Sequence, residues 1–319
     1  MIDTMRAYLN GEKLIGCGEQ NANHLLSSMQ RYANFREVAT AGGTRYYKGN
    51  LKNLQVWYSP IEGLTIEGSI PKYRNGENIS TLSRGNTEEA FRELESECGY
   101  PIGEASISRL DLGICVQTEQ PPQLYYQAFV HCPNHTRETR DNSLLFQSKS
   151  SPIILYDKVA ESKKSEGGLP KSWQNALNLL RFEAKLKGHI PRQLGVPSLV
   201  VSDLYNESVW SIMATELEKR WESIQKINPT TAVCAPTTAK QVREFAFAQR
   251  LSDNGIEAHL EQLQVLRNAG TLPPKEYKRA VDEAVRAFET FAQTSVQAKQ
   301  LVEELDGKVK TAIDEALRI

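Results

Sequence analysis

The spacing of apolar residues divides the chain into two parts. Over roughly the first 190 residues, short segments of alternating apolar and polar residues are separated by Gly, Pro and Asn, a pattern typical of half-buried β-strands. The remainder is rich in Ala, Glu, Lys, Leu and Gln and repeats its apolar residues at helical spacing. We therefore predict a sheet-containing domain over residues 1–200 and a helical domain over residues 201–319.

The same patterns predict the individual elements. Asn86 and Glu89 have the spacing of a capping box and start a helix that runs to about Cys98. A second helix is expected from Pro121 to about Val130. With the strands, these helices indicate an α+β fold in which a mostly antiparallel sheet is covered by helices on one face. We expect strands at residues 2–9, 44–48, 53–59, 64–70, 106–116, 152–158 and 179–187, and C-terminal helices at residues 205–225, 237–252, 256–268, 273–290 and 294–318.

Four of these strands place their charged residues on one face of the expected sheet. In strand 64–70, Glu67 shares a face with Thr65 and Ser69, and the apolar residues lie on the other face. The same alternation holds in three later strands. If the four belong to one sheet, its apolar face takes the helices, and its polar face carries Glu67, Arg109, Asp111, Tyr156, Lys158, Arg181, Glu183 and Lys185.

This set of side chains suits the cleavage of a phosphodiester bond. Its three carboxylates can hold a hard divalent ion such as Mg²⁺ or Mn²⁺, which polarises the scissile phosphate. A tyrosine hydroxyl has an ordinary pKa of about 10, so it needs a nearby cation to act as a nucleophile at neutral pH. We assign that role to Lys158, two residues from Tyr156, or to Arg109 or Arg181.

Each of these strands alone is weak evidence for a site. Alternating charge is ordinary on a half-solvated sheet, and a tyrosine in a strand more often serves packing than catalysis. Trp57, Tyr58 and Tyr73 likewise suit either base stacking or core packing. The agreement of four strands favours a catalytic face over a merely solvated one.

Charge is concentrated locally rather than over the whole chain. With 38 basic and 39 acidic residues, the formal net charge is −1, so no global positive field indicates a nucleic-acid partner. Residues 149–192 nevertheless hold nine basic residues against four acidic ones. We interpret this stretch as a DNA-facing patch with Arg181, Lys185 and Lys187 as contacts, although Lys-rich loops are also common on solvated surfaces.

The cysteines and histidines argue against a disulfide framework and a zinc site. The five cysteines are an odd number without a CxxC pair, which indicates reduced thiols. His131 and His135 flank a Cys-Pro-Asn segment whose Pro and Asn predict a turn rather than a metal site. The N-terminus lacks an apolar signal core, and no run approaches the ~20 apolar residues of a membrane helix. We expect a protein of the cytoplasm.

Five segments, MIDTMRAYL, TIEGSIPKY, SRLDLG, ILYDKVAE and LLRFEAKLK, occur in this order within residues 1–195. They resemble the gene II/X replication proteins of filamentous phages and, more distantly, Rep_trans-type plasmid initiators. The resemblance implies nicking of a double-stranded origin in a bacterial host, a 5′-phosphotyrosyl intermediate, strand transfer and a free 3′-OH. A host polymerase then extends that end in rolling-circle replication, with a host helicase as a further partner.

The resemblance also implies roles for individual residues. The nucleophile falls on Tyr156, and the metal ligands fall on Glu67, Asp111 and Glu183. The wider class of tyrosine nickases holds its metal through two histidines that flank one apolar residue. No such triplet occurs in this sequence, so a carboxylate-rich site is expected.

Two other functions fit the same sequence. A non-catalytic DNA-binding regulator on the same fold is favoured if Glu67, Asp111 and Glu183 lie too far apart to share one ion. A single-strand chaperone that uses the sheet face would bind nucleic acid without metal dependence. The sequence leaves the oligomeric state and the role of the helical domain open.

Overall fold

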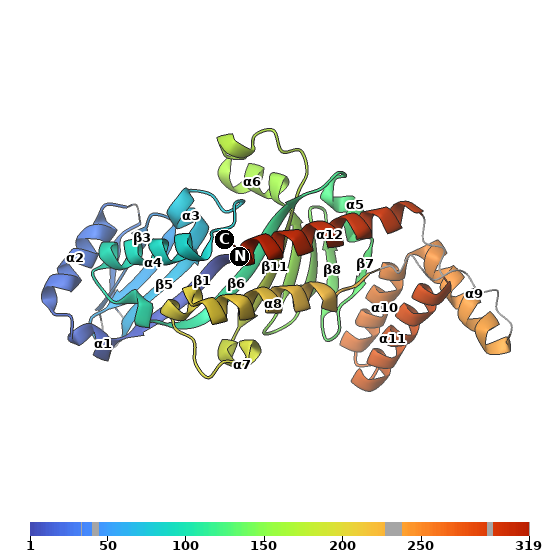
Figure 1. The fold of residues 1–319 in the computed structure, drawn as a ribbon. Coiled ribbons are helices and arrows are strands. Elements are labelled where there is room, and N and C mark those ends of the chain that lie inside the picture. The colour runs from blue at the N-terminus through green and yellow to red at the C-terminus, as the bar shows by residue number, and fades with distance from the viewer. Residues whose placement is uncertain (33, 40–44, 227–237, 292–295, 319) are drawn as a thin grey trace.

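The protein folds around one large antiparallel sheet. The computed structural model describes residues 1–32, 34–39, 45–226, 238–291 and 296–318. Within these residues, ten strands form the sheet: β1 (Ile2–Asn10), β2 (Arg36–Ala39), β3 (Arg45–Leu51), β4 (Leu54–Ser59), β5 (Gly63–Ser69), β6 (Ser106–Gln117), β8 (Thr136–Arg140), β9 (Ser143–Gln147), β10 (Ile153–Asp157) and β11 (Leu179–Lys187). Their order is β2-β3-β4-β5-β1-β6-β11-β10-β9-β8, and neighbouring strands are antiparallel (Figure 1). A second, two-stranded sheet pairs β7 (Phe129–His131) with β12 (Gln225–Lys226).

Helices connect the strands and follow them. The earlier helices are α1 (Gly11–Ile15), α2 (Glu19–Gln30), α3 (Ile70–Asn75), α4 (Arg84–Cys98), α5 (Pro122–Tyr126), α6 (Lys158–Glu166) and α7 (Ile190–Leu194). The later ones are α8 (Glu207–Ser223), α9 (Ala239–Asn254), α10 (Ile256–Asn268), α11 (Pro274–Phe291) and α12 (Val296–Arg318). Short 3-10 turns are η1 (Ile102–Glu104), η2 (Lys171–Trp173) and η3 (Val201–Tyr205). None of the described helices is both long and apolar enough to cross a bilayer.

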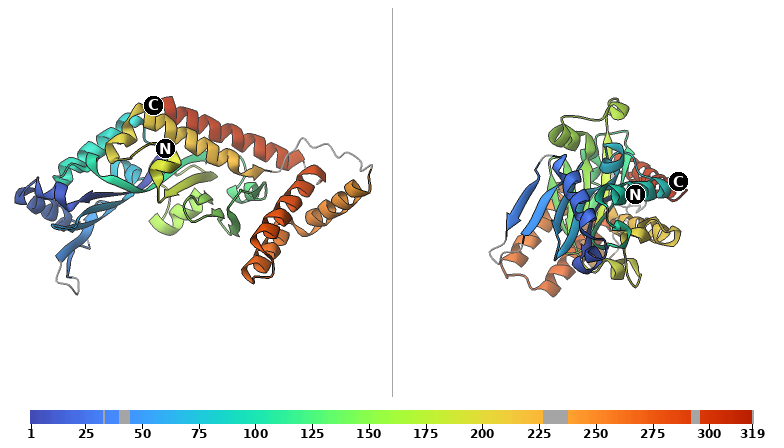
Figure 2. Two further views of the ribbon diagram at one scale, coloured as in Figure 1. Left: turned by 90° about the horizontal axis from the view of Figure 1, so that it is seen from below. Right: turned by 90° about the vertical axis from the view of Figure 1, so that its left-hand side faces the viewer.

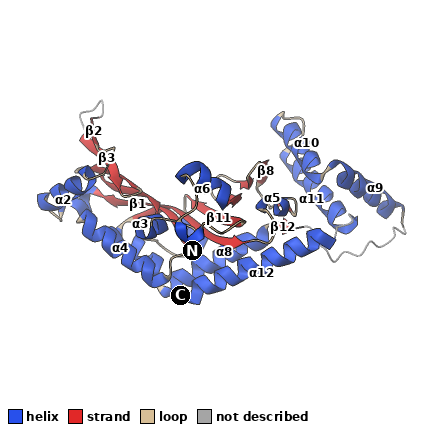
Figure 3. Ribbon diagram, turned by 90° about the horizontal axis from the view of Figure 1, so that it is seen from above, coloured by secondary structure: helices blue, strands red, loops and turns tan. Residues whose placement is uncertain are grey.

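The apolar face of the sheet packs against the long helices. Figure 3 shows α4, α8 and α12 along this face and α6 on the opposite face. Trp210 and Trp221 of α8 are buried in this core, and their indole N–H groups donate to Ala316 O and Asp306 Oδ1 of α12. The predicted α+β fold with a helix-covered sheet is therefore confirmed, with the short α6 as an addition on the other face.

Residues after 200 contribute to two different apolar cores. Leu305, Val309 and Ile313 of α12 belong to the core of the large sheet, together with α8. Helices α9, α10 and α11 pack around a separate cluster that includes Leu251 and Val285, at one end of the molecule (Figure 2). The C-terminal region is helical as predicted, yet α8 and α12 share the core of the sheet. The division into domains at residue 200 stays a prediction.

Most predicted elements match the structure to within a few residues, and residues 44, 237, 294 and 295 of those predictions lie outside the described residues. Two helix predictions are wrong at one end. Helix α4 begins after Ser83, whose side chain accepts from the N–H of Asn86, so Asn86 is not the cap. The helix expected to reach Val130 ends at Tyr126, because the following residues pair with β12 far along the chain.

The segment that contains His131 and His135 forms a turn in the structure. The His135 N–H donates to the Cys132 carbonyl, and Asn134 adopts a φ of 64°, so this segment is the predicted turn. Cys234 lies outside the described residues. The described cysteines are free thiols: Cys17, Cys98, Cys115 and Cys132.

We expect Leu305→Ala to lower the free energy of unfolding of the sheet core by about 3 kcal/mol, because Leu305 is fully buried in that core. Leu317→Ala in the same helix is the matched control. Leu317 is 41% exposed, so its truncation should cost about 0.5 kcal/mol or less. Urea unfolding of the two variants measures the difference, and equal losses would show that α12 does not stabilise the sheet.

Candidate active site

The register of the sheet gathers charged residues from separate strands on its polar face. Residues directly opposite one another in neighbouring antiparallel strands point to the same face. Arg109 lies opposite Arg6, and Arg6 lies opposite Glu67. The alternation read from the sequence therefore describes this face correctly within the strands. Lys158, predicted as the end of a strand, is instead the first residue of α6. Further opposed pairs are Tyr156 with Arg181, Lys185 with Asp111, and Lys187 with Arg109.

Tyr156 and Glu183 are in direct contact on this face. The Tyr156 hydroxyl donates a hydrogen bond of 2.7 Å to Glu183 Oε1. Burial and the Glu183 carboxylate raise the pKa of Tyr156 above its ordinary value, whereas Arg181 acts to lower it. Burial and the charge of Asp3 in turn raise the pKa of Glu183. Glu183 is therefore a stronger base than an exposed carboxylate, and it is placed to take the phenolic proton.

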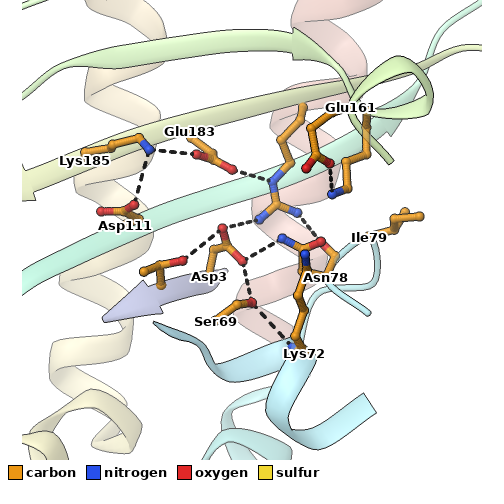
Figure 4. A network of polar contacts seen from close by, with 12 residues as sticks. Asp3, Ser69, Lys72, Asn78, Ile79, Asp111, Glu161, Glu183 and Lys185 are labelled. Atoms are coloured by element: carbon orange, nitrogen blue, oxygen red, sulfur yellow. Dashed lines mark hydrogen bonds and ion pairs between the residues drawn. The ribbon is translucent and has the colours of Figure 1, made fainter. Parts of the chain in front are cut away.

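Arg181 connects the two carboxylates nearest to this contact. Its side chain is 3% exposed, with Nη2 3.4 Å from Asp3 Oδ2 and Nε 3.3 Å from Glu183 Oε1. Its Nη1 donates to the backbone oxygen of Asn78. Because a buried guanidinium is costly unless it is paired and hydrogen-bonded, these three partners fix its position. Figure 4 shows Asp3, Asn78 and Glu183 turned toward one centre.

Asp3 is a site residue that the sequence reasoning missed. The pairing of β1 with β6 shifts its register at this residue, and the carboxylate turns to the polar face. There Asp3 Oδ1 accepts hydrogen bonds from Ser69 and Asn78. Although burial opposes its ionisation, Arg181 and these two hydrogen bonds hold the pKa of Asp3 below its ordinary value. The sequence shows Asp3 in the first strand, but it does not show the register shift that turns its side chain to the polar face.

Gly113 provides the space in which two of these side chains lie. It is directly opposite Glu183 in the neighbouring strand. A Cβ at this position would lie 3.0 Å from Glu183 Cγ and 3.1 Å from Arg181 Nη2. A larger residue in the middle of β6 would therefore displace the carboxylate that receives the Tyr156 hydrogen bond.

The other predicted acids are bound to cations on the same face. Arg109 donates to both oxygens of Asp111, at 3.0 Å and 2.6 Å, and to Glu67 at 2.7 Å. Lys185 Nζ lies 3.5 Å from Asp111 Oδ2 and 3.5 Å from Glu183 Oε2 (Figure 4). Each of the three predicted metal ligands therefore has a basic side chain as its partner.

These ion pairs decide how well the site fits a metal ion. Within the described ranges, no group of three or more His, Cys, Asp or Glu side chains is placed to hold a metal ion. As arranged, Glu67, Asp111 and Glu183 do not fit a shared divalent ion, because basic groups occupy their oxygens. The requirement for Mg²⁺ or Mn²⁺ stays a prediction.

Lys158 lies just beyond the strand that carries Tyr156. Strand β10 ends at Asp157, which caps α6 by accepting from the Ala160 N–H. The Lys158 side chain is 1% exposed, and its Nζ lies 2.5 Å from Glu161 Oε2. The cation that lowers the pKa of Tyr156 is Arg181 and not Lys158. A catalytic role of Lys158 therefore stays a prediction.

Comparison with known proteins identifies the family. Residues 51–223 match the family model for the N-terminal part of the gene II replication-associated protein of phages. The chain belongs to this family. It is a phage replication-associated protein with a role in the initiation of DNA replication, which confirms the gene II resemblance. No curated protein matches the chain.

The family match includes most of the polar face. It spans Tyr156, Arg181 and Glu183, together with the strands that carry Glu67 and Asp111. Strand β1 and helices α9 to α12 lie outside the matched residues. Asp3 therefore joins the site from a part of this replication-associated protein that the family match does not cover.

We expect Asp3→Asn to lower the free energy of unfolding by about 3 kcal/mol, because it removes one charge of a buried pair and leaves Arg181 with too little compensation. Glu37→Gln is the control, since the Glu37–Arg45 pair is exposed and 3.6 Å long and should contribute about 1 kcal/mol or less. Denaturant unfolding gives both values. A loss for Asp3→Asn no greater than that of the control would contradict the structural importance of this pair.

Proposed function

We propose that this protein initiates phage DNA replication as a nickase in which Tyr156 cuts one strand of the double-stranded origin. The observation that carries the proposal is the 2.7 Å hydrogen bond from Tyr156 Oη to Glu183 Oε1, on a face that also presents basic groups. Membership of the gene II replication-associated family supports DNA as the partner. The reaction joins the 5′-phosphate to Tyr156 and leaves a free 3′-OH.

The proposed step exchanges one bond at phosphorus and moves one proton. Tyr156 Oη attacks the phosphorus while its proton passes to Glu183 Oε1. The bond from phosphorus to O3′ breaks, and O3′ takes a proton from solvent. In strand transfer, a 3′-OH attacks the phosphotyrosine, its proton goes to solvent, and Glu183 returns its proton to the leaving Tyr156 oxygen.

Basic residues of the same face are assigned to the DNA. Lys185 and Arg109 stabilise the negative charge that develops on the phosphate oxygens. Lys187 is exposed and contacts a neighbouring phosphate of the backbone. Arg181 is buried and paired, so in this proposal it positions Glu183 instead of contacting DNA. The released 3′-OH is the end that a host polymerase extends and beside which a host helicase opens the duplex.

We expect Tyr156→Phe to abolish the covalent protein–DNA adduct and to leave DNA binding nearly unchanged, because the change removes only the attacking oxygen. Supercoiled DNA that carries the cognate phage origin is incubated with protein in Mg²⁺, in Mn²⁺ and in EDTA. Relaxation on gels and an adduct stable to SDS are the readouts. Tyr126→Phe is the matched control, since Tyr126 is buried in the apolar core and its hydroxyl donates to Asn142 O.

A wild-type protein that leaves the substrate intact under all three conditions would reject the nickase. Binding of the origin without cleavage would then support the alternative, a DNA-binding regulator on the same fold. The observation that favours this alternative is the pairing of Glu67, Asp111 and Glu183 with basic groups. Cleavage in Mg²⁺ or Mn²⁺ and its loss in EDTA would support the expected metal.

We expect the rate of single-turnover nicking to rise with pH as Glu183 loses its proton. Its pKa is raised by burial and by Asp3, so the midpoint of the rise lies above the ordinary glutamate value of about 4.3. Asp3→Asn removes a negative neighbour and leaves Arg181 free to favour the Glu183 carboxylate, so the midpoint moves to lower pH. Rapid-quench rates across the pH range measure the shift, and an unchanged midpoint would contradict Glu183 as the base.

A further inference from the structure

The polar face continues past the candidate active site to the other end of the sheet. From Tyr156 in β10 it crosses β11, β6, β1 and β5 to β4, which is five steps between neighbouring strands or roughly 24 Å at the usual strand spacing. There Arg36, Lys48 and Trp57 lie directly opposite one another, and the register continues through β5 to Tyr8. Figure 3 shows β2 and β3 at this end of the sheet, away from α6.

The balance of charge differs between the two ends of the face. Around Tyr156 the carboxylates and the basic groups are paired. In the part of the chain that the structure describes, Arg36 and Lys48 form no ion pair, and Arg6 lies 3.8 Å from Glu67 with its own side chain 51% exposed. Basic groups without carboxylate partners are available to the phosphates of a nucleic acid.

Trp57 is the aromatic residue among these basic groups. Arg6 lies 5.8 Å and Lys48 lies 5.2 Å from the centre of the Trp57 ring, and they come from strands on opposite sides of β4. The other two residues considered for base stacking, Tyr58 and Tyr73, are buried in the core. Only Trp57 of the three is partly exposed and lies on the polar face.

A hollow of about 410 Å³ opens on β2, β3 and β4 next to Trp57. Its volume lies in the range of small-ligand sites. Its amide side chains can donate to and accept from the edge of a base, and its guanidinium and ammonium groups suit a phosphate. The residues that line it are Asn34, Phe35, Arg36, Lys48, Asn50 and Gln55.

We propose that this second site, formed by Arg36, Lys48, Trp57 and the hollow, binds an unpaired nucleotide of the DNA strand that Tyr156 cuts. The base stacks on the indole, its edge meets the amides of the hollow, and its phosphate lies by the two basic groups. The identity of the strand rests on the proposed nickase function, whereas the binding of single-stranded DNA does not. Binding at this second site, roughly 24 Å from Tyr156 across the strands of the sheet, keeps the DNA strand unpaired beside the reacting phosphate.

Stacking is tested with fluorescently labelled oligothymidylate and with the same strand made abasic at internal positions. We expect Trp57→Ala to weaken binding of the base-bearing strand about tenfold and binding of the abasic strand little. The preference for the base-bearing strand should therefore nearly vanish in the variant. Trp173→Ala is the control, because Trp173 lies in η2 and bonds to Ser80 outside this surface, and it should keep the preference. Trp57→Leu replaces Trp57→Ala if the latter fails to fold.

The phosphate contact is tested by the salt dependence of the same binding. Lys48→Ala should reduce the slope of log affinity against log salt by about 0.7, the value for one contact to a single strand. Arg45→Ala is the matched control from the same strand. Arg45 is 74% exposed, but it lies an odd number of residues from Lys48 and so points to the other face. Its slope should equal that of the wild type.

Two results would overturn the second site. Equal losses for base-bearing and abasic strands in Trp57→Ala would mean that Trp57 only supports the sheet edge, and a wild-type salt slope in Lys48→Ala would remove the phosphate contact. Failure of the nickase proposal is a separate result, the absence of any covalent adduct in the wild-type protein. A strand preference that depends on Trp57 would still support single-strand binding at this end of the face.

Discussion

The burial of the Arg181 guanidinium is the constraint on which the polar face depends. A cation with 3% exposure destabilises the fold unless carboxylates and carbonyls surround it. Its partners come from the first strand, from the segment after α3 and from its own strand, at Asp3, Asn78 and Glu183. One ion-pair network thus sets the relative positions of three distant segments. Glu183, which this network holds in place, in turn positions the Tyr156 hydroxyl by accepting its hydrogen bond.

The alternation of side chains along a strand depends only on that strand's own residues. Much of this face could therefore be predicted from the sequence. Glu67, Asp111 and Glu183 lie on the predicted face because each strand follows its own pleat. The position of Asp3 depends on a register shift against β6, which a single strand cannot reveal. The early end of α5 also depends on a distant part of the chain. The pairing of β7 with β12 overrides the local preference for helix after Tyr126.

Knowing which side chains share a face does not reveal how their charges pair. A partly buried carboxylate next to Arg or Lys gains a charge-assisted hydrogen bond, so Asp111 and Glu67 join Arg109 and leave the role of metal ligand untested. The consequence is a gradient along the sheet. The basic groups near Tyr156 are paired with carboxylates, whereas Arg36 and Lys48 form no ion pair among the described residues. In the proposed function, the second site therefore attracts phosphates more strongly than the surroundings of Tyr156 do.

The packing of α12 has a consequence for the order in which the chain can fold as it is made. Leu305, Val309 and Ile313 complete the core of the sheet, although α9, α10 and α11 precede them in the chain. Until residues 296–318 have left the ribosome, the apolar surfaces of α8 and β6 that contact α12 stay exposed to water. A nascent chain therefore completes the core of its sheet only after those residues have emerged.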